Sequence, residues 1–121
     1  MKYICLIYSD ESQWPKLPQN AMEQMMSEYR EFTNSIKASG HYVTGDRLQP
    51  STAATTVRVR DGRLSSTDGP FAETKEQLGG YYIVEAKNAD EAVAIAGRIP
   101  SVRVGGSVEV RPIMEMGPPP R

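Results

Sequence analysis

The chain has 121 residues and a formal net charge of -1, from 14 basic and 15 acidic side chains. This length predicts one domain, and the balanced charge gives no overall field that would attract nucleic acid or an anionic membrane. Cys5 is the only cysteine, which excludes an internal disulfide and favours a reducing compartment. No apolar run is long enough to span a bilayer, and the first residues carry no signal-peptide pattern. We therefore expect a soluble, cytoplasmic protein.

The first third of the chain predicts a strand, a loop and a helix. Residues 3–8 form a continuous apolar run, typical of a strand that is covered on both faces. The polar loop that follows holds Trp14, the only tryptophan, which either plugs the edge of the core, the commoner case, or walls a pocket. From Asn20, apolar side chains recur with helical spacing as far as Ile36, and Gly40 ends the helix. The methionines of this stripe favour a core position over an adaptable binding surface.

The remaining elements are a strand, a hairpin and a second strand-helix-strand unit. Asp61-Gly62 is the strongest hairpin signal in the chain, and the strand before it alternates, with Val57 and Val59 turned inward. A helix begins after Asn88 and is stopped by Pro100. The expected strands are residues 41–48, 55–60, 63–67, 80–86 and 107–112. Residues 1–116 are expected to form the single domain, and residues 117–121, with three consecutive prolines, a flexible tail.

The order predicts an α+β fold of the ferredoxin-like kind, β-α-β-(β-hairpin)-β-α-β, with two helices on one face of an antiparallel sheet. The hairpin is an insertion between the two β-α-β halves. Because the helices cover only one face, the other face needs a cover, and we expect a partner subunit to supply it.

Residues 68–80 are tightly specified. Pro70 fixes its own φ and cannot donate a backbone hydrogen bond. Thr74 and Gln77 have the spacing of a capping box, which predicts a one-turn helix that Gly79 ends. Asp68 stands at the rigid corner, where a carboxylate could act in acid-base chemistry. The alternative is that Asp68 only caps its own loop, and from the residues alone this is the commoner case.

Other chemistry has little support in the sequence. One histidine and one cysteine, far apart, give no metal site, and no serine has a nucleophile-elbow pattern. No glycine-rich pattern for a phosphate or dinucleotide cofactor is present, so we expect no metal and no cofactor. The hairpin arginines, Arg58, Arg60 and Arg63, are interpreted as a solvated strand face rather than a nucleic-acid site. His41 is the only histidine, and a lone histidine is more often structural than catalytic. Tyr29 either belongs to the core or presents its hydroxyl to a cavity.

The run from Asp68 to Tyr82 resembles the signature of the YCII-related family, in its DGPF branch, and similarity extends over nearly the whole chain. The resemblance implies a bacterial cytoplasmic protein with a ferredoxin-like fold that forms a homodimer as a dimeric α+β barrel. It also implies a His-Asp pair proposed as an active site in a better-studied branch. Asp68 matches the aspartate, but the first helix has no histidine, so any chemistry would use Asp68 with a different partner.

Two hypotheses follow. The first is a small-molecule binder or acid-base enzyme with a pocket at the dimeric sheet face, where Asp68 is the functional carboxylate. The expected pocket residues are Trp14, Tyr29, His41, Phe71 and Glu73. The second is a sensor or interaction module that regulates a sigma factor, because DGPF-branch members are often encoded beside extracytoplasmic-function sigma factors.

Overall fold

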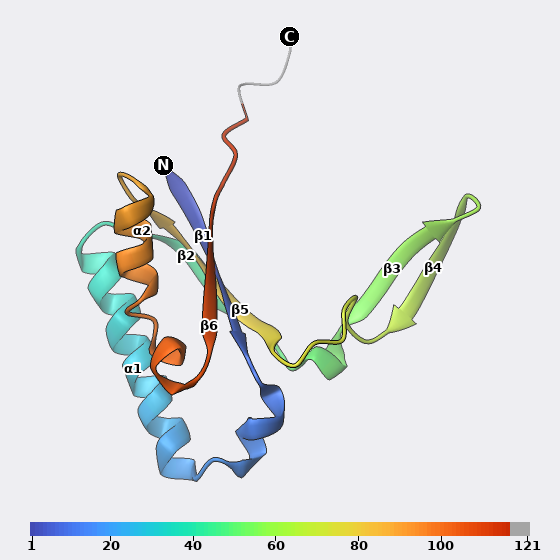
Figure 1. The fold of residues 1–121 in the computed structure, drawn as a ribbon, viewed down its shortest axis with the longest axis horizontal. Coiled ribbons are helices and arrows are strands. Elements are labelled where there is room, and N and C mark those ends of the chain that lie inside the picture. The colour runs from blue at the N-terminus through green and yellow to red at the C-terminus, as the bar shows by residue number, and fades with distance from the viewer. Residues whose placement is uncertain (117–121) are drawn as a thin grey trace.

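The computed structural model describes residues 1–116 of the 121, and its elements are shown in Figure 1. The strands are β1 (Lys2–Ser9), β2 (Tyr42–Arg47), β3 (Thr55–Arg60), β4 (Arg63–Asp68), β5 (Gln77–Glu85) and β6 (Ser107–Pro112). The α-helices are α1 (Gln19–Ala38) and α2 (Ala89–Ala96), and the short 3₁₀ helices are η1 (Glu11–Lys16), η2 (Ser51–Ala53) and η3 (Pro100–Val104). The tail predicted for residues 117–121 lies outside the described residues. No helix within residues 1–116 is long and apolar enough to cross a membrane.

Four strands form one antiparallel sheet in the order β2-β5-β1-β6, and both α-helices lie on the same side of it (Figure 1). Strand β5, from the second half of the chain, pairs between β1 and β2. This interleaving of two β-α-β halves is the ferredoxin-like plan, and the predicted fold class is confirmed.

The core lies between the helices and the inner face of the sheet. Side chains alternate along a strand, so every second residue of β1 and β5 points toward the helices. The helix α1 contributes Phe32 and Ile36, and both are buried. The other buried apolar residues are Tyr3, Cys5, Ile7, Tyr82, Val84, Ala86, Ala92, Ile95, Ala96 and Ile99. Burying a large aliphatic or aromatic side chain contributes about 1.5–3 kcal/mol, so this layer holds the helices on the sheet.

The opposite face of the sheet, which we call the open face, carries no helix (Figure 1). Alternation places Ile4 and Leu6 of β1 and Tyr81 and Ile83 of β5 on it, and all four are half-buried. The Tyr81 hydroxyl donates a hydrogen bond of 2.7 Å to the Asp46 carboxylate. The centre of this face is therefore apolar, as expected for a surface that needs a cover.

Residues 55–68 form a hairpin, which we call the arm, that is separate from the main sheet. Strands β3 and β4 pair only with each other, and Figure 1 shows them projecting from the body. Asp61 and Gly62 have φ values of 52° and 75°, as the two central residues of a type I′ turn require. The predicted hairpin is confirmed at this turn.

One predicted element is absent from the described chain. Residues 74–77 form no helix, and Gln77 is the first residue of β5, paired with Ser9. The Gln77 side chain donates a hydrogen bond of 2.5 Å to the Thr74 carbonyl and accepts one of 3.0 Å from the Glu11 amide. The capping-box prediction was wrong because strand pairing with β1 uses the backbone that a helix would need.

Candidate functional site

A cleft of about 1070 Å³ opens between the first half of α1 and the inner face of the sheet. The helices η1 and η3 contribute to its walls through Trp14 and Ser101. This cleft is on the helix-covered side, whereas the sequence predicted a pocket on the other face of the sheet. Its other lining residues include Ile7, Met22, Met25, Tyr29, Arg47, Gly80 and Gly106.

The cleft exists because the inner face loses its side chains toward one end. Along β5, the inward positions run from Val84 and Tyr82, which are buried in the core, to Gly80, which has no side chain. A Cβ atom at Gly80 would lie 3.0 Å from the Asp46 carbonyl oxygen, closer than nearly all real contacts. The bare end of the sheet therefore leaves space under α1.

The methionine stripe of α1 faces this space. Only Phe32 and Ile36 of the helix are buried, while Met22 and Met25 are half-buried and line the cleft. The interpretation of these methionines as plain core was wrong, because the sheet opposite them carries glycine. Methionine is unbranched and polarizable, so it adapts readily to the shape of an apolar ligand.

Two hydroxyl groups meet inside the cleft. The Tyr29 hydroxyl and Ser101 Oγ form a short hydrogen bond that joins α1 to η3. Burial raises the pKa of the Tyr29 phenol, and its hydrogen bonds with Ser101 offset part of that rise. The phenol is therefore protonated at neutral pH, and it is a proton donor rather than a base.

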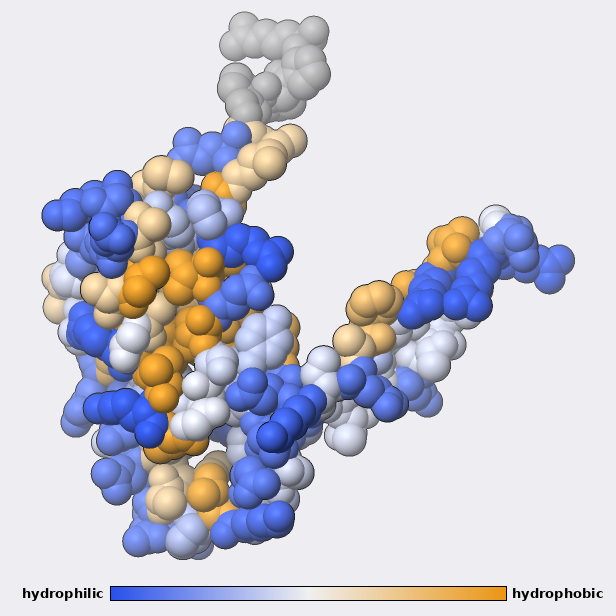
Figure 2. Space-filling model, in the orientation of Figure 1, coloured by the Kyte–Doolittle hydropathy of each residue, from blue (hydrophilic) through white to orange (hydrophobic). Residues whose placement is uncertain are grey.

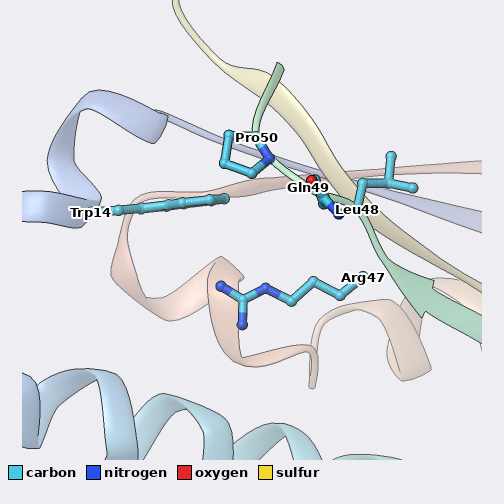
Figure 3. A pocket seen from close by; sticks show the side chains of 5 residues that line it. All are labelled: Trp14, Arg47, Leu48, Gln49 and Pro50. Carbon is cyan, nitrogen blue, oxygen red and sulfur yellow. The ribbon is translucent and has the colours of Figure 1, made fainter. Parts of the chain in front are cut away.

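Arg47 supplies a cation to the same cleft. Its guanidinium lies 5.7 Å from the centre of the Trp14 ring, a cation-π distance, and Nη1 approaches Met26 Sδ at 3.2 Å. Figure 3 shows the Trp14 ring between Pro50 on one side and the Arg47 guanidinium on the other, beside a smaller recess of about 350 Å³. Trp14 thus holds one end of the Arg47 side chain without neutralising its charge.

Of the five pocket residues predicted from the sequence, the structure brings Trp14 and Tyr29 together at the cleft. His41, Phe71 and Glu73 do not line it. Phe71 and Glu73 are exposed, and the Arg58 guanidinium lies 5.1 Å from the centre of the Phe71 ring.

Asp68 is the last residue of β4, paired with Thr55 at the root of the arm. Its side chain is exposed and does not line the cleft. The catalytic role predicted for Asp68 therefore has no support from the geometry of one chain, and it stays a prediction.

His41 belongs to a hydrogen-bonded cluster at the other end of α1. Its Nδ1 atom lies 2.6 Å from Ser39 Oγ, and its Nε2 atom lies 3.3 Å from Glu91 Oε1. The Glu91 carboxylate also accepts a hydrogen bond of 3.1 Å from the Lys87 amide. The cluster ties the end of α1 to the start of α2, which is a structural role.

This cluster predicts a pH dependence of stability. The hydrogen bond from the Lys87 amide, followed by the nearby His41, lowers the pKa of Glu91. A lowered pKa in the folded state contributes stability above the unfolded-state pKa, about 4.3, and that stability is lost as the pH falls through the folded value. We expect Glu91→Gln to lower the urea midpoint at pH 7 and to match wild type near pH 3.

Asp90→Asn is the matched control, because Asp90 lies in the same first turn of α2. It should shift the midpoint less than Glu91→Gln at neutral pH. Equal shifts for the two variants would mean that both carboxylates stabilise the protein only through their attraction to the positive N-terminal end of α2, and that the contacts of Glu91 with Lys87 and His41 add nothing.

Cys5 is not a candidate nucleophile. Its side chain is fully buried in β1, and burial raises the pKa of the thiol to about 11, so the reactive thiolate is scarce at neutral pH. Within residues 1–116, no three histidine, cysteine or carboxylate side chains lie together as metal ligands.

Sequence reasoning missed Arg47 and Ser101. Arg47 ends a strand and Ser101 follows Pro100, and neither position belongs to a motif. The signal that could have indicated the cleft was the pairing of a methionine-rich helix half with the glycine pair Gly79-Gly80.

Comparisons with known proteins place the chain in a family. A family model described as the YCII-related domain matches residues 1–117. An uncharacterized protein of Rhizobium meliloti (strain 1021) is 37% identical over 114 residues, which cover 93% of this chain and 92% of the relative.

A solved structure has a similar fold. It is 5-chloro-2-hydroxyhydroquinone dehydrochlorinase (TftG) from Burkholderia phenoliruptrix AC1100, in complex with 2,5-dihydroxybenzoquinone. The TM-score is 0.56 at 14% sequence identity, and the match covers 96% of each chain. At this identity the likeness shows the fold alone, an α+β fold with an antiparallel sheet. Since the family model covers almost every residue, the resemblance is confirmed, and the chain belongs to the YCII-related domain family.

Proposed function

We propose that the cleft binds a small molecule with a flat, apolar body and an oxygen-bearing, anionic group. The observation that carries this proposal is the convergence of the Tyr29-Ser101 hydroxyl pair and the Arg47 cation within one largely apolar cleft. Polar groups that converge in a mainly apolar cavity are a usual mark of a small-molecule site. The lining also includes Lys75 and the carboxylates Asp10, Glu28, Asp46 and Glu76, so the ligand's anionic group must lie beside Arg47 and away from them.

Each wall has a distinct part in this proposal. Met22, Met25 and Trp14 provide apolar surface for the body of the ligand. Arg47 offers a fixed positive charge and several N–H donors to an anionic oxygen. Tyr29, protonated at neutral pH, donates a hydrogen bond to a second oxygen, and in a reaction it would be the general acid.

The similar solved structure supports this choice of ligand. The ligand in that complex, 2,5-dihydroxybenzoquinone, is a flat ring that carries oxygen atoms, and a ring of this kind suits the groups in the cleft. We therefore choose it as the anionic probe, with neutral hydroquinone as the uncharged comparison.

We expect 2,5-dihydroxybenzoquinone to bind the wild-type protein, and Arg47→Met to weaken this binding about tenfold or more, because a hydrogen bond to a charged group contributes about 1.5–3 kcal/mol. Hydroquinone should respond little to Arg47→Met. Tyr29→Phe should weaken both probes about three- to tenfold, since it removes one neutral hydrogen bond. Isothermal titration calorimetry gives the affinities, and the fluorescence of Trp14, the only tryptophan, reports occupation of the cleft.

The matched control is Arg111→Met, which removes an exposed arginine from β6 outside the cleft. It should leave both affinities unchanged. If neither probe binds at about 1 mM, or if Arg47→Met and Tyr29→Phe bind as wild type does, the proposed ligand class is wrong.

Asp68→Asn separates this proposal from the acid-base role predicted for Asp68. If the groups in the cleft of one chain suffice for binding, this variant retains the wild-type affinity. A loss of affinity in Asp68→Asn would restore Asp68 as the functional carboxylate. The alternative function, regulation of a sigma factor, rests on the family resemblance alone.

A further inference from the structure

One carboxylate holds η1 to the segment that follows β2. Ser51 donates two hydrogen bonds to Glu11, from its backbone amide to Oε1 at 2.7 Å and from its Oγ to Oε2 at 2.6 Å. Hydrogen bonds to an ionised acceptor are roughly twice as strong as those between neutral groups. Both oxygens of Glu11 are thus engaged by one residue 40 positions away, and Glu11 itself does not line the cleft.

The first residue of β5 also holds η1. Gln77 Oε1 accepts a hydrogen bond of 3.0 Å from the Glu11 backbone amide, and Gln77 Nε2 donates one of 2.5 Å to the Thr74 carbonyl. Two residues further on, a Cβ atom added to Gly79 would lie 3.8 Å from the Trp14 ring, so this ring lies beside the bare backbone of β5. The start of β5 therefore supports both the backbone of η1 and its tryptophan.

These contacts decide where Trp14 and Arg47 lie. None of the six residues of η1 is buried, so the helix depends on them for its position. Figure 1 shows η1 across the cleft from the first half of α1, and in Figure 2 hydrophobic residues fill the strip between the two. The Trp14 ring lies between Pro50 and the Arg47 guanidinium, which is 5.7 Å from the ring centre (Figure 3). Pro50 directly precedes Ser51, so the hydrogen bonds of Ser51 also fix this stack.

We propose that Glu11 is a positioning residue that makes the cleft prefer anionic over neutral ligands. By joining η1 to the segment after β2, it holds Trp14 and the Arg47 side chain in place before a ligand arrives. A long side chain that is ordered only on binding weakens affinity about two- to tenfold. The inference rests on the proposed function, because it takes Arg47 as the group that binds the anion.

The sign of the expected effect separates positioning from charge. We define the preference of the cleft as the dissociation constant of hydroquinone divided by that of 2,5-dihydroxybenzoquinone. Glu11 is an anion, so if its charge acted directly on the ligand, Glu11→Ala would raise this preference. We expect the opposite, a preference about two- to tenfold lower, because Arg47 must then be ordered by the ligand.

The test is a double-mutant cycle measured by isothermal titration calorimetry. Glu11→Ala should lower the preference in the wild-type background and leave it unchanged in the Arg47→Met background, because Arg47 carries the effect. Glu11→Gln should keep part of the preference, since its amide oxygen can still accept the Ser51 amide. Glu23→Ala is the matched control, which removes an exposed carboxylate of α1 outside the cleft and should change nothing.

A second measurement needs no ligand. Acrylamide quenching of Trp14, the only tryptophan, should increase in Glu11→Ala and stay at the wild-type level in Glu23→Ala. Circular dichroism checks the fold, and Glu11→Gln replaces Glu11→Ala if the alanine variant does not fold.

Two results would overturn the role of Glu11: unchanged quenching in its variants, or an equal fall of the preference with and without Arg47. A failure of the proposed function looks different. In that case neither probe binds wild type, and the selectivity falls with it, whereas increased quenching in Glu11→Ala would still show that Glu11 holds Trp14.

Discussion

Replacing Ile36 by alanine is expected to lower the free energy of unfolding by about 2–5 kcal/mol, since it removes a large side chain and leaves a cavity. Ile36 is fully buried in the half of α1 that contacts the sheet, and it belongs to the same core cluster as Phe32 and Val84. A domain of this size has a total free energy of unfolding of about 5–15 kcal/mol, so the variant is expected to lose a large part of its stability. Urea unfolding followed by circular dichroism measures the change.

Met26→Ala is the control for helix propensity and side-chain size. Met26 lies on the same helix but is 41% exposed, so we expect a loss below about 1 kcal/mol. Similar losses for the two variants would contradict the description of α1 as packed in its second half and open in its first.

Gly45→Ala is expected to destabilise the protein by about 1–3 kcal/mol, because it overpacks the edge of the core. A Cβ atom at position 45 would lie 2.7 Å from Cδ1 of Tyr82. The Tyr82 ring cannot move away easily: it meets Phe32 edge-on at 5.2 Å, and its hydroxyl is hydrogen-bonded to Thr33 at 2.7 Å. Since Tyr82 also lines the cleft, affinity for the cleft ligand should fall in the same variant.

Gly79→Ala on the neighbouring strand β5 should have the opposite sign. Its added Cβ would lie 3.8 Å from the Trp14 ring, an ordinary contact, and its φ is not in the left-handed region. A glycine replaced without strain stabilises by about 0.4–1 kcal/mol through the unfolded chain. Thermal unfolding measures the stability of both variants. If both are destabilised equally, the close contact between a Cβ at position 45 and the Tyr82 ring is not the cause.

Local chemistry was sufficient to predict several elements. The Asp61-Gly62 turn has positive φ at both residues, as the dipeptide indicates. Asn88 caps α2 by accepting a hydrogen bond from the Glu91 amide, as the spacing of the two residues predicts. In both cases the determining contacts lie within a few residues of one another.

The same local rules failed where a distant segment competes. Thr74 and Gln77 have capping-box spacing, but the backbone of Gln77 pairs with Ser9 in the sheet. The helical period of α1 correctly identified which face turns inward, yet it could not tell whether a side chain or a glycine lies opposite. For Met22 and Met25 that difference decided between core and cleft.

The sequence by itself determined the α+β fold, the amphipathic α1, the hairpin turn and the placement of both helices on one face of the sheet, because periodicity and turn chemistry act over short distances. Only the tertiary structure decided that Tyr29, Arg47 and Ser101 meet in one cleft, and that Asp68 lies apart from it on the arm. These residues come from segments far apart in the chain. Whether they meet depends on the order of the strands and on how much of the length of α1 packs against the sheet. No local pattern encodes either quantity.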